Sequence, residues 1–189
     1  MVRLNKLIMI NLFIIIINFT PVIYASSTMT FKAIIGDDIT GCDIILPETT
    51  LTFKPLHAKD IVEPASTFQI NKLSLQLFCE DEVKDIIPSI TLKGSTPYGY
   101  TDAIFLNGEP NGVGFMVRKN NGNQPSLGDF YNIDDAIKNN DYPLSLNILG
   151  NVNSYYSVED FWVGLVGPLS DTIKPGPFSA TLIININFR

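Results

Sequence analysis

Residues 178–188 read Phe-Ser-Ala-Thr-Leu-Ile-Ile-Asn-Ile-Asn-Phe. Apolar side chains recur here at every second position, which is the pattern of a strand that buries one face. The other face is mostly polar. The sequence therefore predicts a long C-terminal strand that packs on a hydrophobic core with Phe178, Ala180, Leu182, Ile184, Ile186 and Phe188.

Similar alternation recurs outward from this stretch, between turn residues such as Asn107-Gly108. Further strands are predicted at 28–35, 43–46, 68–79, 89–93, 112–119, 144–149 and 161–166. A one-residue slip near Lys72 predicts a bulge, and one helical turn is predicted within 134–140. Because the chain has no internal repeat and no linker, we expect one all-β domain of the sandwich type.

Composition excludes several classes of function. The 189 residues carry a net charge of −6, with 13 Lys and Arg against 19 Asp and Glu, whereas a nucleic-acid binder needs a basic face. Two Cys and one His leave little for a zinc site, and His57 has no Ser or Cys motif beside it. The acidic pairs are typical of solvated turns. We therefore expect no catalytic residue, no metal and no cofactor.

The N-terminal segment has the layout of a secretory signal peptide. Arg3 and Lys6 precede the apolar run Leu7–Phe19, and Tyr24-Ala-Ser-Ser27 offers small residues for cleavage. A membrane anchor is the alternative, but the run has 13 residues where a span needs about 20. The sequence therefore predicts a signal peptide at 1–25 and an exported chain without a membrane span.

Export changes the interpretation of the two cysteines. In an oxidising compartment, Cys42 and Cys79 are expected to form one disulfide, and two free buried thiols are the alternative. The 37-residue spacing corresponds to a stabilisation of about 4 kcal/mol in the chain-entropy description.

Five motifs stand in an order that is typical of one family. They are Phe31-Lys-Ala-Ile-Ile35 shortly before Cys42, the run 68–79 that ends on the second Cys, Gly114-Phe-Met-Val117, Gly176 near the C-terminus, and the penultimate aromatic Phe188. In these respects the chain resembles a pilin subunit of the chaperone–usher pathway, of the type 1 and P-pilus kind. It departs from that family in having Ala33 where a Gly is usual, and Phe188 where a Tyr is usual.

The resemblance implies an incomplete immunoglobulin-like β-sandwich that lacks its final strand and is completed by donor-strand complementation. It divides the chain into a signal peptide (1–25), a donor-strand extension (26–41) and a pilin domain (42–189). The implied donor residues are Met29, Phe31, Ala33 and Ile35. The implied acceptor groove, which also binds the chaperone, consists of Phe178, Ala180, Leu182, Ile184, Ile186, Phe188 and Arg189.

The resemblance also implies a function and a set of partners. The partners are a periplasmic pilus chaperone, an outer-membrane usher and neighbouring pilin subunits, on a route through the periplasm to a cell-surface fimbrium that supports cell adhesion. Length and an Asn-rich, Ala-poor composition favour a minor or adaptor subunit over the major one. Two alternatives remain: a single-domain adhesin that binds a host glycan or protein through aromatic residues near Trp162, and an unrelated exported enzyme.

Overall fold

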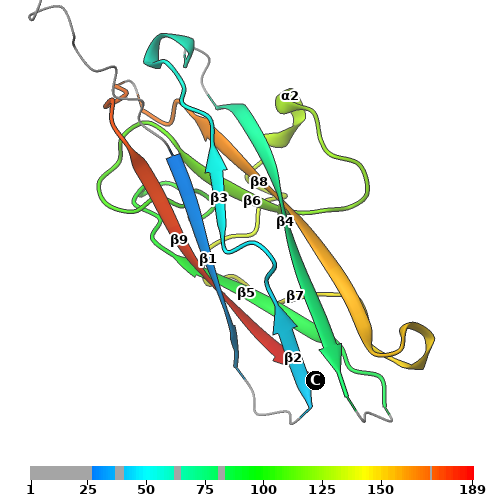
Figure 1. Cartoon of the computed structure of the whole chain (residues 1–189). Coiled ribbons are helices and arrows are strands. Elements are labelled where there is room, and N and C mark those ends of the chain that lie inside the picture. The colour runs from blue at the N-terminus through cyan, green and yellow to red at the C-terminus, as the bar shows by residue number, and fades with distance from the viewer. Residues whose placement is uncertain (1–26, 37–40, 62–64, 81–83, 171) are drawn as a thin grey trace, which may run out of the picture.

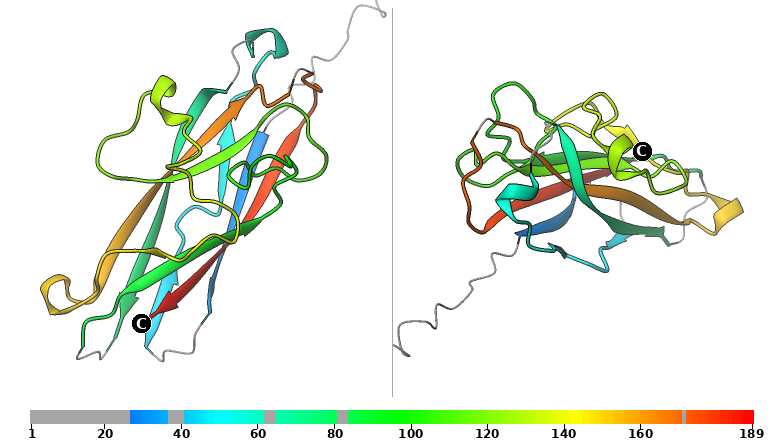
Figure 2. Two further views of the ribbon diagram at one scale, coloured as in Figure 1. Left: turned by 180° about the vertical axis from the view of Figure 1, so that it is seen from behind. Right: turned by 90° about the horizontal axis from the view of Figure 1, so that it is seen from above.

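The computed structural model describes residues 27–36, 41–61, 65–80, 84–170 and 172–189. These residues form two β-sheets that enclose a common core (Figures 1 and 2). One sheet has five strands in the order β3-β1-β9-β5-β7, and the other has four in the order β2-β4-β8-β6. The predicted all-β, immunoglobulin-like sandwich is thus confirmed. The predicted signal peptide lies outside the described residues.

Most strands coincide with the predicted ranges, but the predicted strand 144–149 is reduced to two residues, the predicted strand 161–166 extends over 156–167, and a strand at 50–53 is not predicted. The five-stranded sheet contains β1 (Ser27–Ile35), β3 (Thr50–Phe53), β5 (Pro88–Gly94), β7 (Leu144–Ser145) and β9 (Phe178–Phe188). The four-stranded sheet contains β2 (Cys42–Ile45), β4 (Ser66–Cys79), β6 (Gly114–Lys119) and β8 (Tyr156–Gly167). The described helices are η1 (Ala58–Asp60), α2 (Leu127–Phe130) and η2 (Asn151–Asn153). None of them has the length and apolar character that a membrane crossing needs.

The main core lies between the two sheets. Alternate residues of β4, β8 and β9 point into it and are almost completely shielded from solvent. Each such side chain stabilises the fold by roughly 1.5–3 kcal/mol relative to an exposed one. The central members are Leu73, Leu75 and Leu77 of β4, Phe161, Val163 and Leu165 of β8, and Leu182, Ile184 and Ile186 of β9.

A second cluster covers part of the outer face of the four-stranded sheet. Met116 of β6 and Val166 of β8 point away from the main core, yet they are buried under Ile104 and Phe130. These two covering residues come from the long connections between β5 and β7, which Figure 2 shows from behind. Gly164 permits this packing, because a Cβ at that position would collide with the Phe130 ring.

Tyr98 anchors one of these connections. Its hydroxyl donates to the Val113 carbonyl at 2.7 Å and accepts from the Gly112 N–H at 3.1 Å. Burial raises the pKa of Tyr98 above its usual value, so the side chain stays neutral and keeps donating at physiological pH.

Two further local predictions are wrong. The helical turn lies at Leu127–Phe130 rather than within 134–140, because the Ser126 Oγ accepts from the Asp129 N–H at 3.2 Å and so caps a helix there. The register shift of β4 lies between Thr67 and Gln69 rather than near Lys72. The change of apolar phase near Lys72 arises because Ile70 packs on the second cluster, outside the main core.

Candidate functional site

The first described strand, β1, is the second strand of the five-stranded sheet. β1 lies between β3 and β9, antiparallel to the former and parallel to the latter (Figure 1). Because paired strands lie about 4.8 Å apart, the rest of the domain has an opening about 10 Å wide where β1 sits. We call this opening, bounded by β3 and β9, the acceptor groove.

Two of the four predicted donor residues penetrate deeply into this groove. Met29 and Phe31 are 0% and 2% exposed, whereas Ala33 is half-buried against the core and Ile35 is 37% exposed. Backbone bonds fix both sides of the strand: the Phe31 N–H donates to the Thr49 carbonyl, and the Gly36 N–H donates to the Ile186 carbonyl, each at 2.8 Å. The chain thus fills its own groove with its own N-terminal strand.

The short connection to β2 explains why β1 runs parallel to β9. Ile35 pairs with Ile186, near the C-terminal end of β9, and Cys42 begins β2 at the same end of the domain (Figure 1). The six residues between Ile35 and Cys42 reach at most about 25 Å, whereas β9 is about 35 Å long. A reversed β1 would place Ile35 at the far end, beyond the reach of this connection.

The alternate apolar residues of β9 face the core, as their alternation predicts. Ala180, Leu182, Ile184, Ile186 and Phe188 are buried, and all five belong to the main core. Phe178 is half-buried, with its ring 5.6 Å from that of Phe115. Arg189 is exposed, and its carbonyl accepts from the Ile87 N–H at 2.7 Å.

Side chains outside β1 hold both walls of the groove. β5 pairs with β9 only up to Leu182, and beyond that point Asn107 continues the ladder: its N–H donates to the Ser179 carbonyl at 2.7 Å, and its Oδ1 accepts from the Thr181 N–H at 3.2 Å. The sequence indicated only a turn at Asn107.

The opposite wall, β3, is tied to the other sheet by two amides. Gln69 of β4 accepts from the Lys54 N–H and donates to the Lys54 carbonyl, both at 2.7 Å. Asn71 of β4 donates to the Thr52 carbonyl at 3.1 Å. These contacts do not involve β1, so they can hold β3 in place when the groove has no strand in it.

Gln69→Ala should loosen β3 without touching the groove lining. It removes two hydrogen bonds, each worth about 1 kcal/mol, so the Lys54 amide should exchange its hydrogen roughly tenfold faster or more. Gln76→Ala, the same change on the outer face of the same strand, is the matched control. Unchanged exchange at Lys54 would show that the Gln69 amide does not hold this wall.

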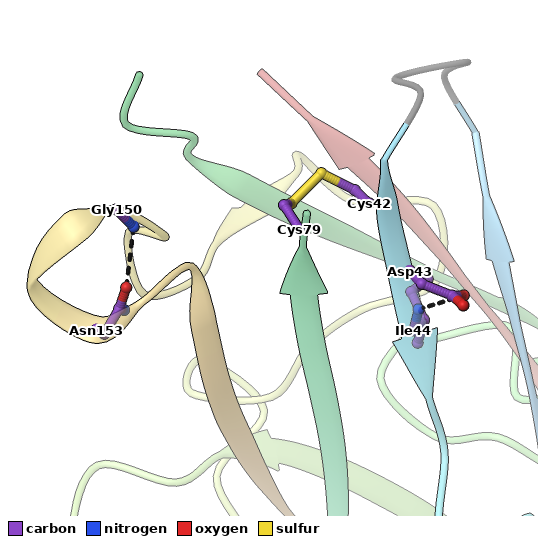
Figure 3. Close-up of a disulfide and its surroundings, with 6 residues drawn as sticks. All are labelled: Cys42, Asp43, Ile44, Cys79, Gly150 and Asn153. Atoms are coloured by element: carbon purple, nitrogen blue, oxygen red, sulfur yellow. Dashed lines mark hydrogen bonds between the residues drawn. A yellow bond between two sulfur atoms is a disulfide. The ribbon is translucent and has the colours of Figure 1, made fainter. Parts of the chain in front are cut away.

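The disulfide lies where the N-terminal segment enters the domain. Cys42 of β2 and Cys79 of β4 are paired in register and joined by a 2.01 Å S–S bond (Figure 3). The predicted pairing is therefore present. It links the first residue of β2 covalently to the last residue of β4, so a pull that reaches Cys42 from the N-terminal side is borne by this bond.

Loss of this disulfide should weaken the domain substantially. Replacing both Cys42 and Cys79 by Ser is expected to lower the free energy of unfolding by about 4 kcal/mol, because the unfolded chain gains the freedom of the opened loop. Without reductant, mass spectrometry of the exported protein should show it two hydrogen atoms lighter than the dithiol. Two thiols that react with an alkylating agent in the natively exported protein would contradict the assignment.

The aromatic residues at and near Trp162, which the adhesin alternative would use to bind a glycan, do not share one face. Phe161 lies in the main core, Trp162 packs on the second cluster, and Tyr155 is buried, while Tyr156 is 44% exposed. Among the described residues, no group of three or more His, Cys, Asp or Glu side chains is placed to hold a metal ion. The acceptor groove is therefore the site that the described residues build most completely.

The model of a family described as fimbrial protein matches residues 38–189. The solved structure of the P pilus rod subunit PapA is similar over 64% of this chain and 79% of that chain, with 13% sequence identity and a TM-score of 0.44. No curated protein sequence matched the chain.

Proposed function

Because this chain belongs to the fimbrial protein family, we propose that it is a structural subunit of a chaperone–usher fimbria and that it joins its neighbours by donor-strand exchange. The observation that carries the proposal is the acceptor groove, a full strand wide, between two walls that are held without β1. Such a groove takes up one extended strand by backbone pairing, and alternate side chains set its register.

The groove also explains the need for a chaperone. When β1 is not in the acceptor groove, the core residues of β9 would face solvent beside an unpaired strand edge. Such a surface favours aggregation. We propose that a periplasmic chaperone lends a strand to Ala180, Leu182, Ile184 and Ile186, with Phe178 and Phe188 at the ends of the groove, and binds the terminal carboxylate of Arg189. At the outer-membrane usher, the extension of another subunit takes that place.

The N-terminal strand supplies the other half of the contact. Met29, Phe31, Ala33 and Ile35 would enter the groove of a neighbouring subunit. Each subunit donates its N-terminal strand and accepts a strand at a different surface, the groove. The contact is therefore head-to-tail, does not close on itself and produces a fibre.

The proposed domain division follows from these roles. We propose a cleaved signal peptide (1–25), a donor extension (26–41) and a pilin domain (42–189), in a subunit that reaches the cell surface and supports adhesion there. Composition favours a minor or adaptor position over the major one. The role is structural and not catalytic.

A protease test follows directly from the position of Lys32 in β1. In the free chain, Lys32 is paired with Ile183 of β9, and the neighbouring Phe31 N–H donates to the Thr49 carbonyl, so trypsin should cut slowly after Lys32. In a complex with the chaperone, the lent strand displaces β1, and cleavage after Lys32 should become fast. Lys72, in the middle of β4, should be resistant in both states. Slow cleavage after Lys32 in a purified chaperone complex would contradict the proposal.

A further inference from the structure

We infer that Asn121 is a site of spontaneous deamidation on the surface of the folded chain, and that the fold protects the two other Asn-Gly pairs from the same reaction. The inference does not depend on the proposed function. It is carried by a difference in hydrogen bonding among the three pairs, which are Asn107-Gly108, Asn111-Gly112 and Asn121-Gly122.

An Asn that precedes a Gly is chemically the most susceptible to this reaction. The backbone nitrogen of the Gly attacks the side-chain carbonyl carbon of the Asn and forms a new N–C bond, while the side-chain NH₂ leaves with the displaced proton as ammonia. Water then opens the resulting succinimide ring to Asp or to isoaspartate. Glycine permits the attack because it has no Cβ to crowd its nitrogen. The reaction therefore needs an Asn side chain that can turn toward an accessible backbone nitrogen.

The fold restrains Asn107 at both polar atoms of its side chain. Its Oδ1 accepts from the Thr181 N–H at 3.2 Å, and its Nδ2 donates to the hydroxyls of Ser179 and Thr181 at 3.3 and 3.2 Å. Its backbone N–H donates to the Ser179 carbonyl at 2.7 Å. Turning this amide toward Gly108 would break its contacts with β9, so the attack requires a local opening of the structure.

The second pair is restrained mainly at its glycine. Gly112 is buried, and its N–H, which carries the attacking nitrogen, donates to the Tyr98 hydroxyl at 3.1 Å. The Asn111 Oδ1 accepts from the Val113 N–H at 3.1 Å. A Cβ on Gly112 would lie 3.1 Å from the nearest atom of Ile173, so the packing leaves little space for a ring at this position.

Asn121 lacks these restraints. The pair lies in the connection from β6 to α2, and both of its residues are exposed (Figure 1). Within the described part of the chain, the Asn121 side chain makes no hydrogen bond, and a Cβ on Gly122 would meet no atom within 4 Å. The Gly122 N–H donates to the Asn120 Oδ1 at 2.9 Å. This is one exposed contact between near neighbours, which a small local motion opens.

The reaction would change the charge of a surface depression of about 340 Å³ that Asn121 helps to line. The charged residues around this depression are Arg118, Lys119, Asp134, Asp135 and Asp141. Two cationic side chains thus face three carboxylates, and the new carboxylate raises the excess of negative charge from one to two. Older molecules should therefore be more acidic at this depression than newly made ones.

The test compares the folded mature chain with the same chain reduced and unfolded in guanidinium chloride, both kept at body temperature in mildly alkaline buffer. Trypsin separates the pairs, because peptide 94–118 contains Asn107 and Asn111 whereas peptide 120–138 contains Asn121. In the folded chain, Asn121 should convert at least about tenfold faster than Asn107 or Asn111, whose hydrogen bonds must open first. In the unfolded chain, the three should convert at similar rates. Fragmentation in the mass spectrometer locates each change of NH₂ to OH.

Asn121→Gln is the matched control, because the longer Gln side chain would have to close a larger and less favourable ring. Position 121 should then stay unmodified, and the acidic form that ion-exchange chromatography resolves in the native chain should accumulate far more slowly. Equal conversion of the three Asn residues in the folded chain would overturn the inference. So would a folded chain in which Asn121 is unmodified once the unfolded chain has converted.

Discussion

Phe31→Asp should lower the free energy of unfolding of the isolated mature chain by at least about 3–5 kcal/mol, the range for removing a buried Phe side chain. Phe31 is 2% exposed and lies in the middle of β1, so the new carboxylate would also have to enter an apolar core or drag the strand out of the groove. Equilibrium unfolding in urea measures the change.

The matched control lies one residue away. Thr30 is on the exposed face of the same strand, and Thr30→Ser should change the free energy of unfolding by less than about 0.5 kcal/mol. If Phe31→Asp were as mild as Thr30→Ser, the N-terminal strand would not fill the groove in the isolated chain.

Ile184→Asp should prevent accumulation of the subunit in the periplasm even when a pilus chaperone is co-expressed. Ile184 is 1% exposed and lies in the middle of β9, where any inserted strand must pack. Phe31→Asp should behave differently: the chaperone brings its own strand, so it should rescue the donor variant and not the groove variant. The measurement is the periplasmic yield of each variant with and without chaperone.

Asn185→Asp provides the control for an added charge. Asn185 is the next residue along β9 and points to the opposite face, half-buried. This variant should accumulate with the chaperone as well as the native chain does. Rescue of Ile184→Asp to the same level would contradict the assignment of β9 as the wall that receives a strand.

The two long terminal strands were predictable because each has an uninterrupted period of two. The stretch 178–188 coincides with β9, and 28–35 differs from β1 only by Ser27. Alternation reveals which side chains of a strand face a core. It contains no information on whether that core belongs to the same subunit or to another one. That β1 lies in its own groove is determined by pairing between residues about 150 positions apart.

Other elements lacked a local signal. β3 has only four residues and lies between Pro47 and Pro55, too short for a clear period, so alternation does not predict it. The side-chain amides of Gln69 and Asn71 donate to the carbonyls of Lys54 and Thr52, which lie 15 and 19 residues earlier in the chain. No local sequence pattern reveals such contacts. The second cluster has no local signal either, because Met116 and Val166 are apolar residues on a sheet face that a two-layer sandwich normally exposes to solvent.

The most direct test of donor-strand exchange uses a neighbouring fimbrial subunit that is held by its chaperone. It is challenged with a peptide of residues 27–36 of this chain, either native or with Phe31→Asp, and release of the chaperone is followed over time. The native peptide should displace the chaperone, and the Phe31→Asp peptide should be far slower, because its largest anchor would bring a charge into an apolar site. Equal rates for the two peptides would contradict the assignment of residues 27–35 as the strand that this subunit donates.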